Sequence, residues 1–361
     1  MYVGRVCVYR ICVDLSQAIM MDTIKPFYFP TTVTFVDDSS AFLSNLCLQL
    51  EPNLAFRLFS SSREALHFVN QRPRHGAPEE QIFAPYRDRT DEDEAHQVIA
   101  MSVDAVRNQV FDNDRFQAAS VVVVDYDMPG LNGLEFCRRI TDPAVRKIML
   151  TGKADERIAV ESFNEGIIHR FIRKQDTSAI SALNRAVRDM QHAYFDNRCQ
   201  SILDTLVTSE YTFLRDEAMG ARVRELFESL GIVEHYLSYS PNGLLMFDSA
   251  GKSYLLIVHT NETLRGVREI AEVQGAPAAF FEALDSGRSL PYFWQTSGYF
   301  PTGGIAWESY MHPATQFTGQ RPYVYAVIPN PPGFDLGHVL SYDRYLEWLD
   351  RDIQKTWSSL T

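Results

Sequence analysis

The chain has 361 residues, with 34 Lys and Arg against 46 Asp and Glu, a formal net charge of −12, and 45% hydrophobic residues. At ~150 residues per domain this length favours two domains, and the apolar content suffices for packed cores, which excludes a wholly disordered chain. The acidic balance disfavours a protein that binds nucleic acid by general neutralisation of phosphates.

Cysteine usage and apolar runs bear on the compartment. Five scattered cysteines without a CxxC pair indicate neither a disulfide framework nor a zinc site, and they favour a reducing, cytoplasmic setting. No run of 18 apolar residues occurs, so we predict no membrane association. Residues 1–30 are expected to form an N-terminal extension in which charged residues interrupt the apolar run, unlike a signal peptide. Whether residues 1–20 are native stays open, because Met20 and Met21 precede the first clear strand.

Residues 31–195 read as strands alternating with helices. Strands are predicted at 31–36, 54–61, 119–124, 147–150 and 167–172, and helices at 42–50, 62–69, 132–140, 155–165 and from 177 onward. Four consecutive valines, 121–124, indicate a strand buried on both faces. The alternation predicts an α/β fold with a doubly wound, five-stranded parallel sheet.

Polar residues stand at the ends of these strands, where functional groups gather in doubly wound sheets. They are Asp37, Asp38, Asp125, Thr151 and Lys174. Three clustered acids need a cation, and ligands made only of oxygen favour Mg²⁺ in phosphate chemistry. One aspartate can then act as a nucleophile toward phosphorus, while a hydroxyl and an ammonium bind phosphoryl oxygens. Singly, each residue could be a helix cap or a surface charge; together, in this order, they favour a phosphoryl site.

These residues lie in VDDS (36–39), VDYDMPGLNG (124–133), LTG (150–152) and RK (173–174), and residues 31–195 resemble a receiver domain of a two-component response regulator. The resemblance implies a flavodoxin-like fold. It implies Asp125 as the phospho-acceptor, with Mg²⁺ held by Asp37, Asp38, Asp125 and the backbone carbonyl of Asp127. It further implies that Thr151 and Lys174 bind the phosphoryl group, that Thr151 and Phe171 act as switch residues, and that Met128, Pro129 and Gly133 form the loop after the acceptor.

Two features depart from the family pattern. Gln175 follows Lys174 where the family usually has a proline in a cis peptide. A cis bond before a residue other than proline costs about 3 kcal/mol, so we expect a trans bond and an altered lysine placement. Asp38 and Asp125 also lie 87 positions apart, about twice the usual receiver spacing, which indicates an insertion at about 71–118.

The inserted segment begins with proline and charged residues and includes the acidic run Asp91–Glu94. Val98, Met101, Val106 and Val110 then predict a helix. The segment is either a surface excursion or a partner or dimer contact, since long loops with partial order tend to be functional.

A helical connector is predicted for 196–230. Ile180 to Tyr194 carry apolar residues at steps of three and four, and apolar positions of helical character continue to Leu230. Most of these apolar positions are explained if the last helix of the receiver packs against its own sheet. The alternative is a connector that passes a rearrangement from receiver to output.

Residues 231–361 read as an α+β output domain of unknown type, with two strands around the turn DSAGK, helices at 262–273 and 278–283, a strand at 323–329 and a last helix at 342–357. An aromatic group between Tyr292 and Tyr310 is read as core or as a ligand pocket. From Asn197 onward, 12 Lys and Arg stand against 19 Asp and Glu, so DNA is an unlikely partner.

The layout, an enlarged receiver before an unusual output domain, resembles that of a quorum-sensing response regulator. The leading hypothesis is a signalling switch and not an enzyme, which a histidine kinase or phosphotransfer protein phosphorylates at Asp125 and which then changes homodimerisation or output contacts. One alternative is a receiver-controlled effector that binds or processes a nucleotide. The other is a pseudo-receiver that acts as a scaffold without phosphorylation.

Overall fold

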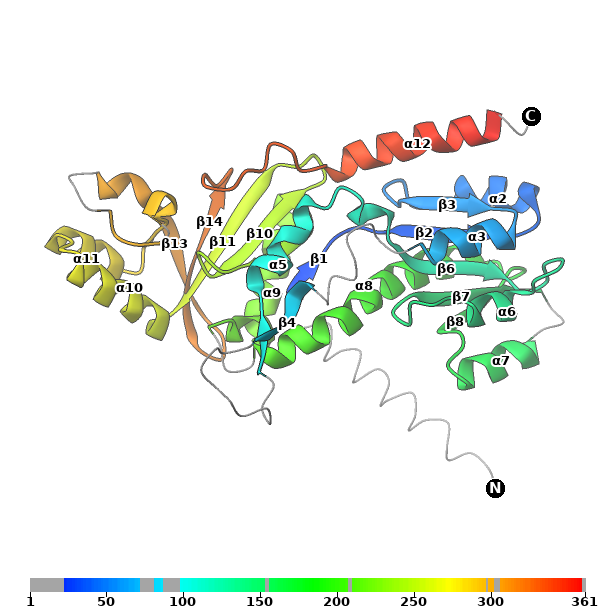
Figure 1. Ribbon diagram of the computed structural model, residues 1–361, viewed down its shortest axis with the longest axis horizontal. Coiled ribbons are helices and arrows are strands. Elements are labelled where there is room, and N and C mark those ends of the chain that lie inside the picture. The colour runs from blue at the N-terminus through cyan, green and yellow to red at the C-terminus, as the bar shows by residue number, and fades with distance from the viewer. Residues whose placement is uncertain are drawn as a thin grey trace, which may run out of the picture. The chain divides into compact units, whose positions relative to one another are not determined.

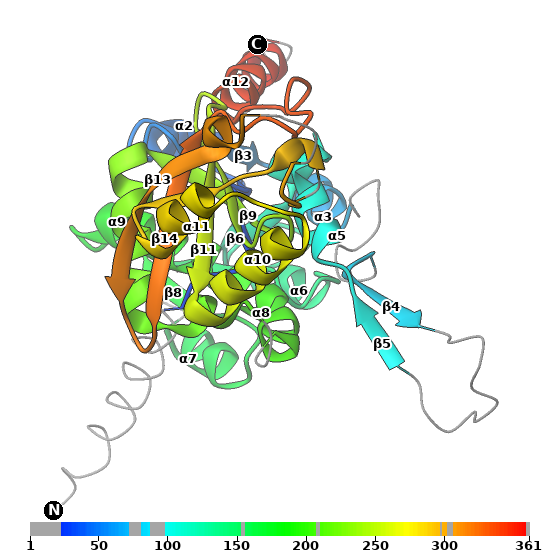
Figure 2. The same ribbon diagram turned by 90° about the vertical axis from the view of Figure 1, so that its left-hand side faces the viewer.

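The computed structural model describes residues 23–71, 81–86, 98–152, 156–206, 210–296, 298–301 and 306–358. The extension at 1–22 and the acidic run Asp91–Glu94 therefore lie outside the described residues. The chain divides into two compact units, drawn in Figures 1 and 2. The parallel-sheet unit contains the described residues of Phe29–Gln81, Val110–Arg198 and Leu340–Thr361. The antiparallel-sheet unit contains those of Met1–Tyr28, Ile82–Gln109 and Cys199–Val339.

The parallel-sheet unit confirms the predicted α/β fold. Its described residues form a five-stranded sheet in the order β3-β2-β6-β7-β8, with β2 Thr32–Val36, β3 Phe56–Phe59, β6 Ala119–Asp125, β7 Arg146–Thr151 and β8 Arg170–Arg173. All four pairings are parallel. The helices are α2 Ser40–Cys47, α3 Ser62–Val69, α6 Gly133–Arg138, α7 Glu156–Asn164 and α8 Ala179–Thr205.

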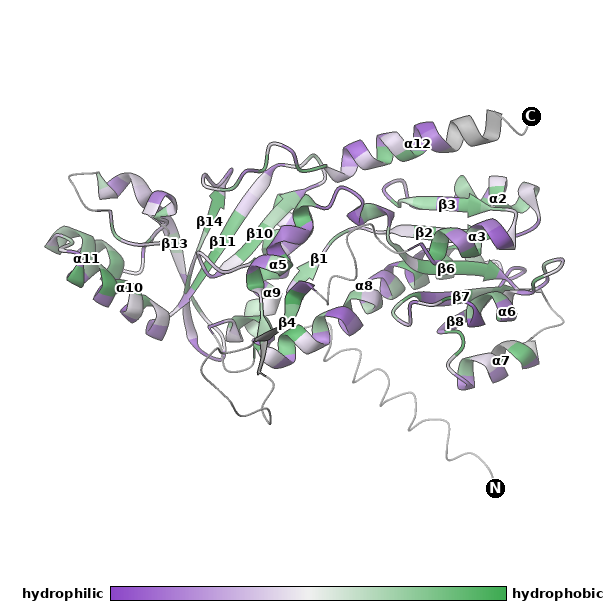
Figure 3. Cartoon of the chain, in the orientation of Figure 1, coloured by the Kyte–Doolittle hydropathy of each residue, from purple (hydrophilic) through white to green (hydrophobic). Residues whose placement is uncertain are grey.

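The sheet is buried on both faces. Val121, Val122, Val123 and Val124 are each at most 1% exposed, as expected for the central strand β6, which Figure 3 colours hydrophobic. Val121 and Val123 belong to a core in which α2 and α8 contribute leucine, valine and methionine side chains. Because side chains alternate along a strand, Val122 and Val124 point to the opposite face. The sheet therefore sits between helix layers, with its strand ends free to carry functional groups.

The C-terminal helix α12 (Tyr342–Ser358; red in Figure 1) belongs to the parallel-sheet unit. Tyr345 is 2% exposed, and its hydroxyl lies 2.6 Å from Thr32 Oγ1 on β2. The Tyr342 hydroxyl donates to Asn53 O and accepts from Ala55 N, at 2.8 and 3.1 Å. The fully buried Phe116 ring contacts both tyrosine rings. The last helix of the chain thus completes the core beside the first strand of the sheet.

The antiparallel-sheet unit is built on a second sheet, which in its described residues has the order β1-β9-β10-β11-β14-β13-β12. The strands are β1 Phe27–Tyr28, β9 Ile232–Ser238, β10 Gly243–Asp248, β11 Ser253–Thr260, β12 Ser289–Pro291, β13 Met311–Thr318 and β14 Pro322–Pro329. Its longer helices are α9 Glu217–Leu230, α10 Asn261–Val273 and α11 Ala278–Asp285. Tyr292, Phe293, Phe300 and Tyr310 are core residues of this unit, which favours the core reading of the aromatic group.

One buried carboxylate ties α9 to the turn between β13 and β14. Asp216, 1% exposed, caps α9 by accepting hydrogen bonds from Ala218 N and Met219 N. It also accepts from Gln320 N and the Tyr323 hydroxyl, at 2.7 and 2.9 Å. Four donors therefore compensate the cost of burying this charge.

Replacing Asp216 with Asn should destabilise the antiparallel-sheet unit by about 2 kcal/mol, because the amide group would face N–H or O–H donors. Chemical denaturation with hydrogen exchange of β13 and β14 amides measures the effect. Asp285→Asn is the control, since Asp285 pairs with Arg268 at the exposed surface. Equal stability of the two variants would contradict the stabilising role of the Asp216 hydrogen bonds.

The inserted segment differs from the helix predicted there. Val98–Met101 form strand β5, which pairs antiparallel with β4 (Phe83–Tyr86). Helix α5 covers only Val103–Asn108, after Ser102 as its N-cap, and a 3₁₀ turn follows at Gln109–Phe111. The prediction of one helix was wrong for 98–101 because β-branched Val98 and Ile99 favour a strand that finds a partner.

The connector is likewise less uniform than its apolar pattern indicates. Helix α8 runs from Ala179 to Thr205, so its first turns belong to the parallel-sheet unit and its last to the antiparallel-sheet unit. A 3₁₀ turn, Thr212–Arg215, precedes α9, which starts after Asp216. Of the helices in the described part of the chain, none combines the length and apolar character needed to cross a bilayer.

Candidate functional site: an acidic pocket at the strand ends

The three predicted acids meet at one edge of the parallel sheet. Asp37 follows β2, Asp38 comes next, and Asp125 is the last residue of β6. One carboxylate oxygen from each lies within 4.8 Å of the others. Asp37 and Asp125 are buried, at 1% and 7% exposure, while Asp38 is exposed. The parallel pairing of β2 with β6 brings residues 87 positions apart into one pocket.

Lys174 enters the same pocket from the end of β8. Its Nζ lies 2.6 Å from Asp37 Oδ2 and 2.8 Å from Asp125 Oδ1. The backbone N–H of Lys174 donates to Thr151 O at 3.0 Å, which fixes the start of the following turn. The Lys174–Gln175 bond is trans, as expected. The lysine nevertheless reaches both acids, so the trans connection does not remove its ammonium from the pocket.

The charges in the pocket are coupled. Burial raises the pKa of Asp125 above its ordinary value, and Asp37 adds to this, although Lys174 opposes it. Burial alone would lower the pKa of Lys174, but hydrogen bonds and charge from Asp125 and Asp37 outweigh it, so that pKa is raised. A positive lysine between two carboxylates is therefore the favoured state.

Thr151 and Phe171, for which the family resemblance implies a switch role, lie on the neighbouring strands β7 and β8. Thr151 ends β7 and is 1% exposed, and its Oγ1 has no hydrogen-bond partner among the described residues. An unpaired buried hydroxyl is costly, so it indicates a group that a bound molecule can satisfy. Phe171 lies half-buried on β8, opposite Met149 on β7.

The loop after Asp125 folds back tightly on the end of β6. Gly133 N donates to Tyr126 O at 3.0 Å, and Asn132 caps α6 by accepting from Glu135 N. A Cβ at Gly133 would lie 2.2 Å from the Asp125 carbonyl oxygen. Met128 is buried and Asp127 is exposed. The glycine is thus required by the close approach of two backbone segments.

Gly133→Ala should displace this loop and destabilise the parallel-sheet unit by about 2 kcal/mol, within the range of an overpacking substitution. Gly152→Ala is the matched control, because a Cβ there meets no atom of the described residues within 4 Å. Thermal unfolding of the two variants checks the difference. A Gly133→Ala protein as stable as Gly152→Ala would show that the loop is not constrained.

The donor set fits a hard divalent cation. Three carboxylates at the ends of adjacent strands supply only oxygen, which suits Mg²⁺. Lys174 neutralises part of their charge, and Thr151 Oγ1 is available for a further oxygen. Sequence reasoning missed Ser39 and Phe42, which also touch this site: Ser39 N donates to Asp37 Oδ1 at 2.9 Å, and the Phe42 ring centroid lies 4.6 Å from Lys174 Nζ.

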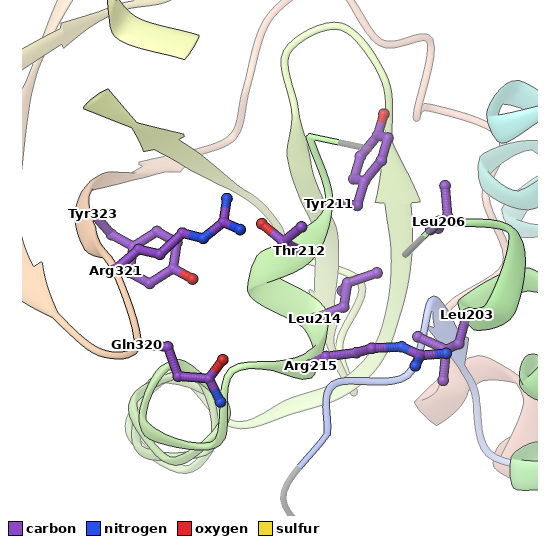
Figure 4. Close-up of a pocket in the computed structure, with 9 residues that line it drawn as sticks. All are labelled: Leu203, Leu206, Tyr211, Thr212, Leu214, Arg215, Gln320, Arg321 and Tyr323. Atoms are coloured by element: carbon purple, nitrogen blue, oxygen red, sulfur yellow. The ribbon is translucent and has the colours of Figure 1, made fainter. Parts of the chain in front are cut away.

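A second cavity, of about 180 Å³, lies in the antiparallel-sheet unit (Figure 4). It is lined by Leu203 near the end of α8, by Leu206 just after that helix, by the 3₁₀ turn before α9 and by the turn between β13 and β14. The Arg321 side chain points toward Thr212, and Arg215 is paired with Asp204 at 2.7 Å. The end of α8 and the turn between β13 and β14, which is hydrogen-bonded to Asp216, therefore line one cavity.

Comparison with known proteins agrees with the predicted fold and family. The sequence model of the family described as response regulator receiver domain matches residues 92–185. The structure of the Legionella pneumophila response regulator LqsR is similar over 90% of this chain and 95% of that chain, with 35% identity and a TM-score of 0.72. The chain therefore belongs to the response regulator family.

More distant structures share only part of the chain. An adenylate cyclase from Rhodopirellula baltica covers 48% of this chain and 98% of its own, at 22% identity and a TM-score of 0.32. A response regulator receiver domain protein from Clostridium thermocellum covers 46% and 97%, at 21% identity and a TM-score of 0.29. A search of curated proteins gave no match.

Proposed function

We propose that this response regulator is switched by Mg²⁺-dependent phosphorylation of Asp125. An Asp125 carboxylate oxygen attacks phosphorus as the bond from phosphorus to a histidine nitrogen of the donor breaks, which leaves an acyl phosphate. The observation that carries the proposal is the Lys174 ammonium, held within 2.8 Å of both Asp37 and Asp125 beside the unpaired Thr151 hydroxyl.

Each residue has a distinct role in this proposal. Asp37, Asp38, Asp125 and the Asp127 carbonyl hold the cation, which when bound neutralises charge on the phosphoryl oxygens. Lys174 binds one phosphoryl oxygen, and Thr151 Oγ1 donates to another. Phe171 then follows the movement of Thr151.

The donor is a histidine kinase or phosphotransfer protein, and the outcome is a change in homodimerisation or in contacts of the antiparallel-sheet unit. Helix α8 supports this, because one continuous helix contributes to both units. The acidic second half, with 12 Lys and Arg against 19 Asp and Glu, supports an output that does not bind DNA.

Light scattering with and without beryllofluoride and Mg²⁺ tests the proposal, because beryllofluoride on Asp125 stands in for the phosphoryl group. We expect a change in oligomeric mass that needs both reagents and is lost in Thr151→Ala. A change that persists in Thr151→Ala would contradict the switch, and no change in the wild type would favour a scaffold that acts without phosphorylation.

A further inference from the structure

We propose that Phe42 is a positioning residue for Lys174, an inference that rests on the proposed function of this pocket. Phe42 lies in the first turn of α2, half-buried against the core shared by α2, α8 and the sheet. Its ring centroid is 4.6 Å from Lys174 Nζ, within the distance at which a cation is attracted to an aromatic face.

The lysine needs such a restraint because its side chain is long and flexible. A lysine ammonium has three rotatable donors on a four-carbon stem, unlike the rigid fork of arginine. Two carboxylates, from Asp37 and Asp125, attract it. Gln175, the next residue, is exposed. The Phe42 ring, with its centroid 4.6 Å from Nζ, is a third contact of the ammonium beside the two carboxylates.

A chain of contacts links the ring back to the metal ligands. Ser39 N donates to Asp37 Oδ1 at 2.9 Å, and Ser39 Oγ accepts from Phe42 N at 3.2 Å as the N-cap of α2. Lys174 Nζ, which the Phe42 ring contacts, donates in turn to the other oxygen of that carboxylate, Asp37 Oδ2, at 2.6 Å. The orientation of the Asp37 carboxylate, the first turn of α2 and the position of the ammonium are therefore set together. Phe42 acts through Lys174 and touches neither phosphorus nor the nucleophilic oxygen.

The chain offers a matched control for loss of core packing. Phe56 is also half-buried against the same core, where its ring contacts Phe35, and it begins β3, whereas the acidic pocket lies at the carboxyl ends of the strands. Phe42→Leu and Phe56→Leu remove similar apolar volume from one core. Only the first removes an aromatic face from Lys174, so a difference between them isolates the contact with the ammonium.

The first measurement needs no phosphorylation. The chain has six lysines, so a spectrum of ¹³Cε-labelled lysine resolves few signals, and Lys174→Arg assigns its own. The ring should shift the Lys174 Hε resonances upfield in the wild type and in Phe56→Leu. The shift should disappear in Phe42→Leu and persist in Phe42→Tyr. A Lys174 signal that does not change in Phe42→Leu would overturn the inference.

The second measurement is the rate of Asp125 phosphorylation by acetyl phosphate with Mg²⁺. Phe42→Leu should lower the maximal rate by about five- to tenfold, with the half-saturating Mg²⁺ concentration unchanged and with rescue by Phe42→Tyr. In a Lys174→Met background, Phe42→Leu should add no further loss, because coupled residues are not additive.

The possible failures are distinguishable. If the wild type is labelled and Phe42→Leu is labelled at the same rate, the positioning role alone is overturned. The same holds if Phe42→Leu lowers the labelling rate as much in the Lys174→Met background as in the wild type. A wild type that takes no label overturns the proposed function, and the role of Phe42 falls with it, because no transfer remains for the lysine to assist.

Discussion

Asp125→Asn should take up no phosphoryl group from acetyl phosphate and Mg²⁺, whereas the wild type should gain one per chain. The substitution keeps the shape of the side chain but removes the anionic oxygen that attacks phosphorus. Asp125 lies at the end of β6, with Oδ1 2.8 Å from the Lys174 ammonium that would bind a phosphoryl oxygen. Intact-mass spectrometry of freshly treated protein measures the gain.

Asp127→Asn is the matched control for this experiment. Asp127 is exposed, and only its backbone carbonyl is proposed as a ligand, so the variant should label like the wild type. Addition of EDTA before acetyl phosphate should abolish labelling in both, since three adjacent acids then lack the cation that neutralises the incoming phosphoryl group. Equal labelling of Asp125→Asn and wild type would place the acceptor elsewhere.

Tyr345→Ala should destabilise the parallel-sheet unit by about 4 kcal/mol, in the range measured for removal of a buried aromatic ring. Tyr345 is 2% exposed and packs against the fully buried Phe116. Thr32 Oγ1 donates to Phe116 O at 2.8 Å, so the Tyr345 hydroxyl is the donor in its own 2.6 Å bond to Thr32. The substitution therefore opens a cavity and removes one buried hydrogen bond.

The controls separate the ring from the hydroxyl. Tyr345→Phe should cost only about 1 kcal/mol, the usual value of one hydrogen bond. Tyr239→Ala, at a side chain that is 62% exposed, should change stability by less than about 0.5 kcal/mol. Denaturation gives the totals, and hydrogen exchange should show faster opening of β2 and β3 amides with β10 and β11 unaffected. An unchanged exchange rate in β2 would contradict the packing of α12.

The receiver fold could be predicted because its signals are local and repeated. The valine run of β6 and the β-branched strand at Thr32–Val36 indicate buried strands by their composition, and parallel pairing follows from the alternation of such strands with helices. The site could be predicted as well, because the carboxyl ends of parallel strands meet at one edge of the sheet. Asp37, Asp38, Asp125 and Lys174 meet there, although the family match begins only at residue 92, beyond the first two acids.

The second sheet was harder to predict because its strands depend on distant partners. Strands β10 and β11 are joined by a short turn and were foreseen, whereas β9, β12 and β13 were not. Strand β13 reads MHPATQFT, with a proline and a partly exposed pattern, and it is fixed by pairing with β14. Phe42 was missed for a related reason: its spacing marks a helix face, but only the fold brings Lys174, 132 positions later, to its ring.

The position of α12 has a consequence for synthesis of the protein on the ribosome. Domains generally fold as units during translation, the N-terminal one first. Here the first strand of the receiver, with Thr32, must wait for Tyr345, a partner that emerges 313 residues later, after the whole antiparallel-sheet unit has been made. The parallel-sheet unit, whose first strand is made early, therefore completes its core only when α12 has been made, and a chain whose synthesis stops early would lack the helix that covers Phe116.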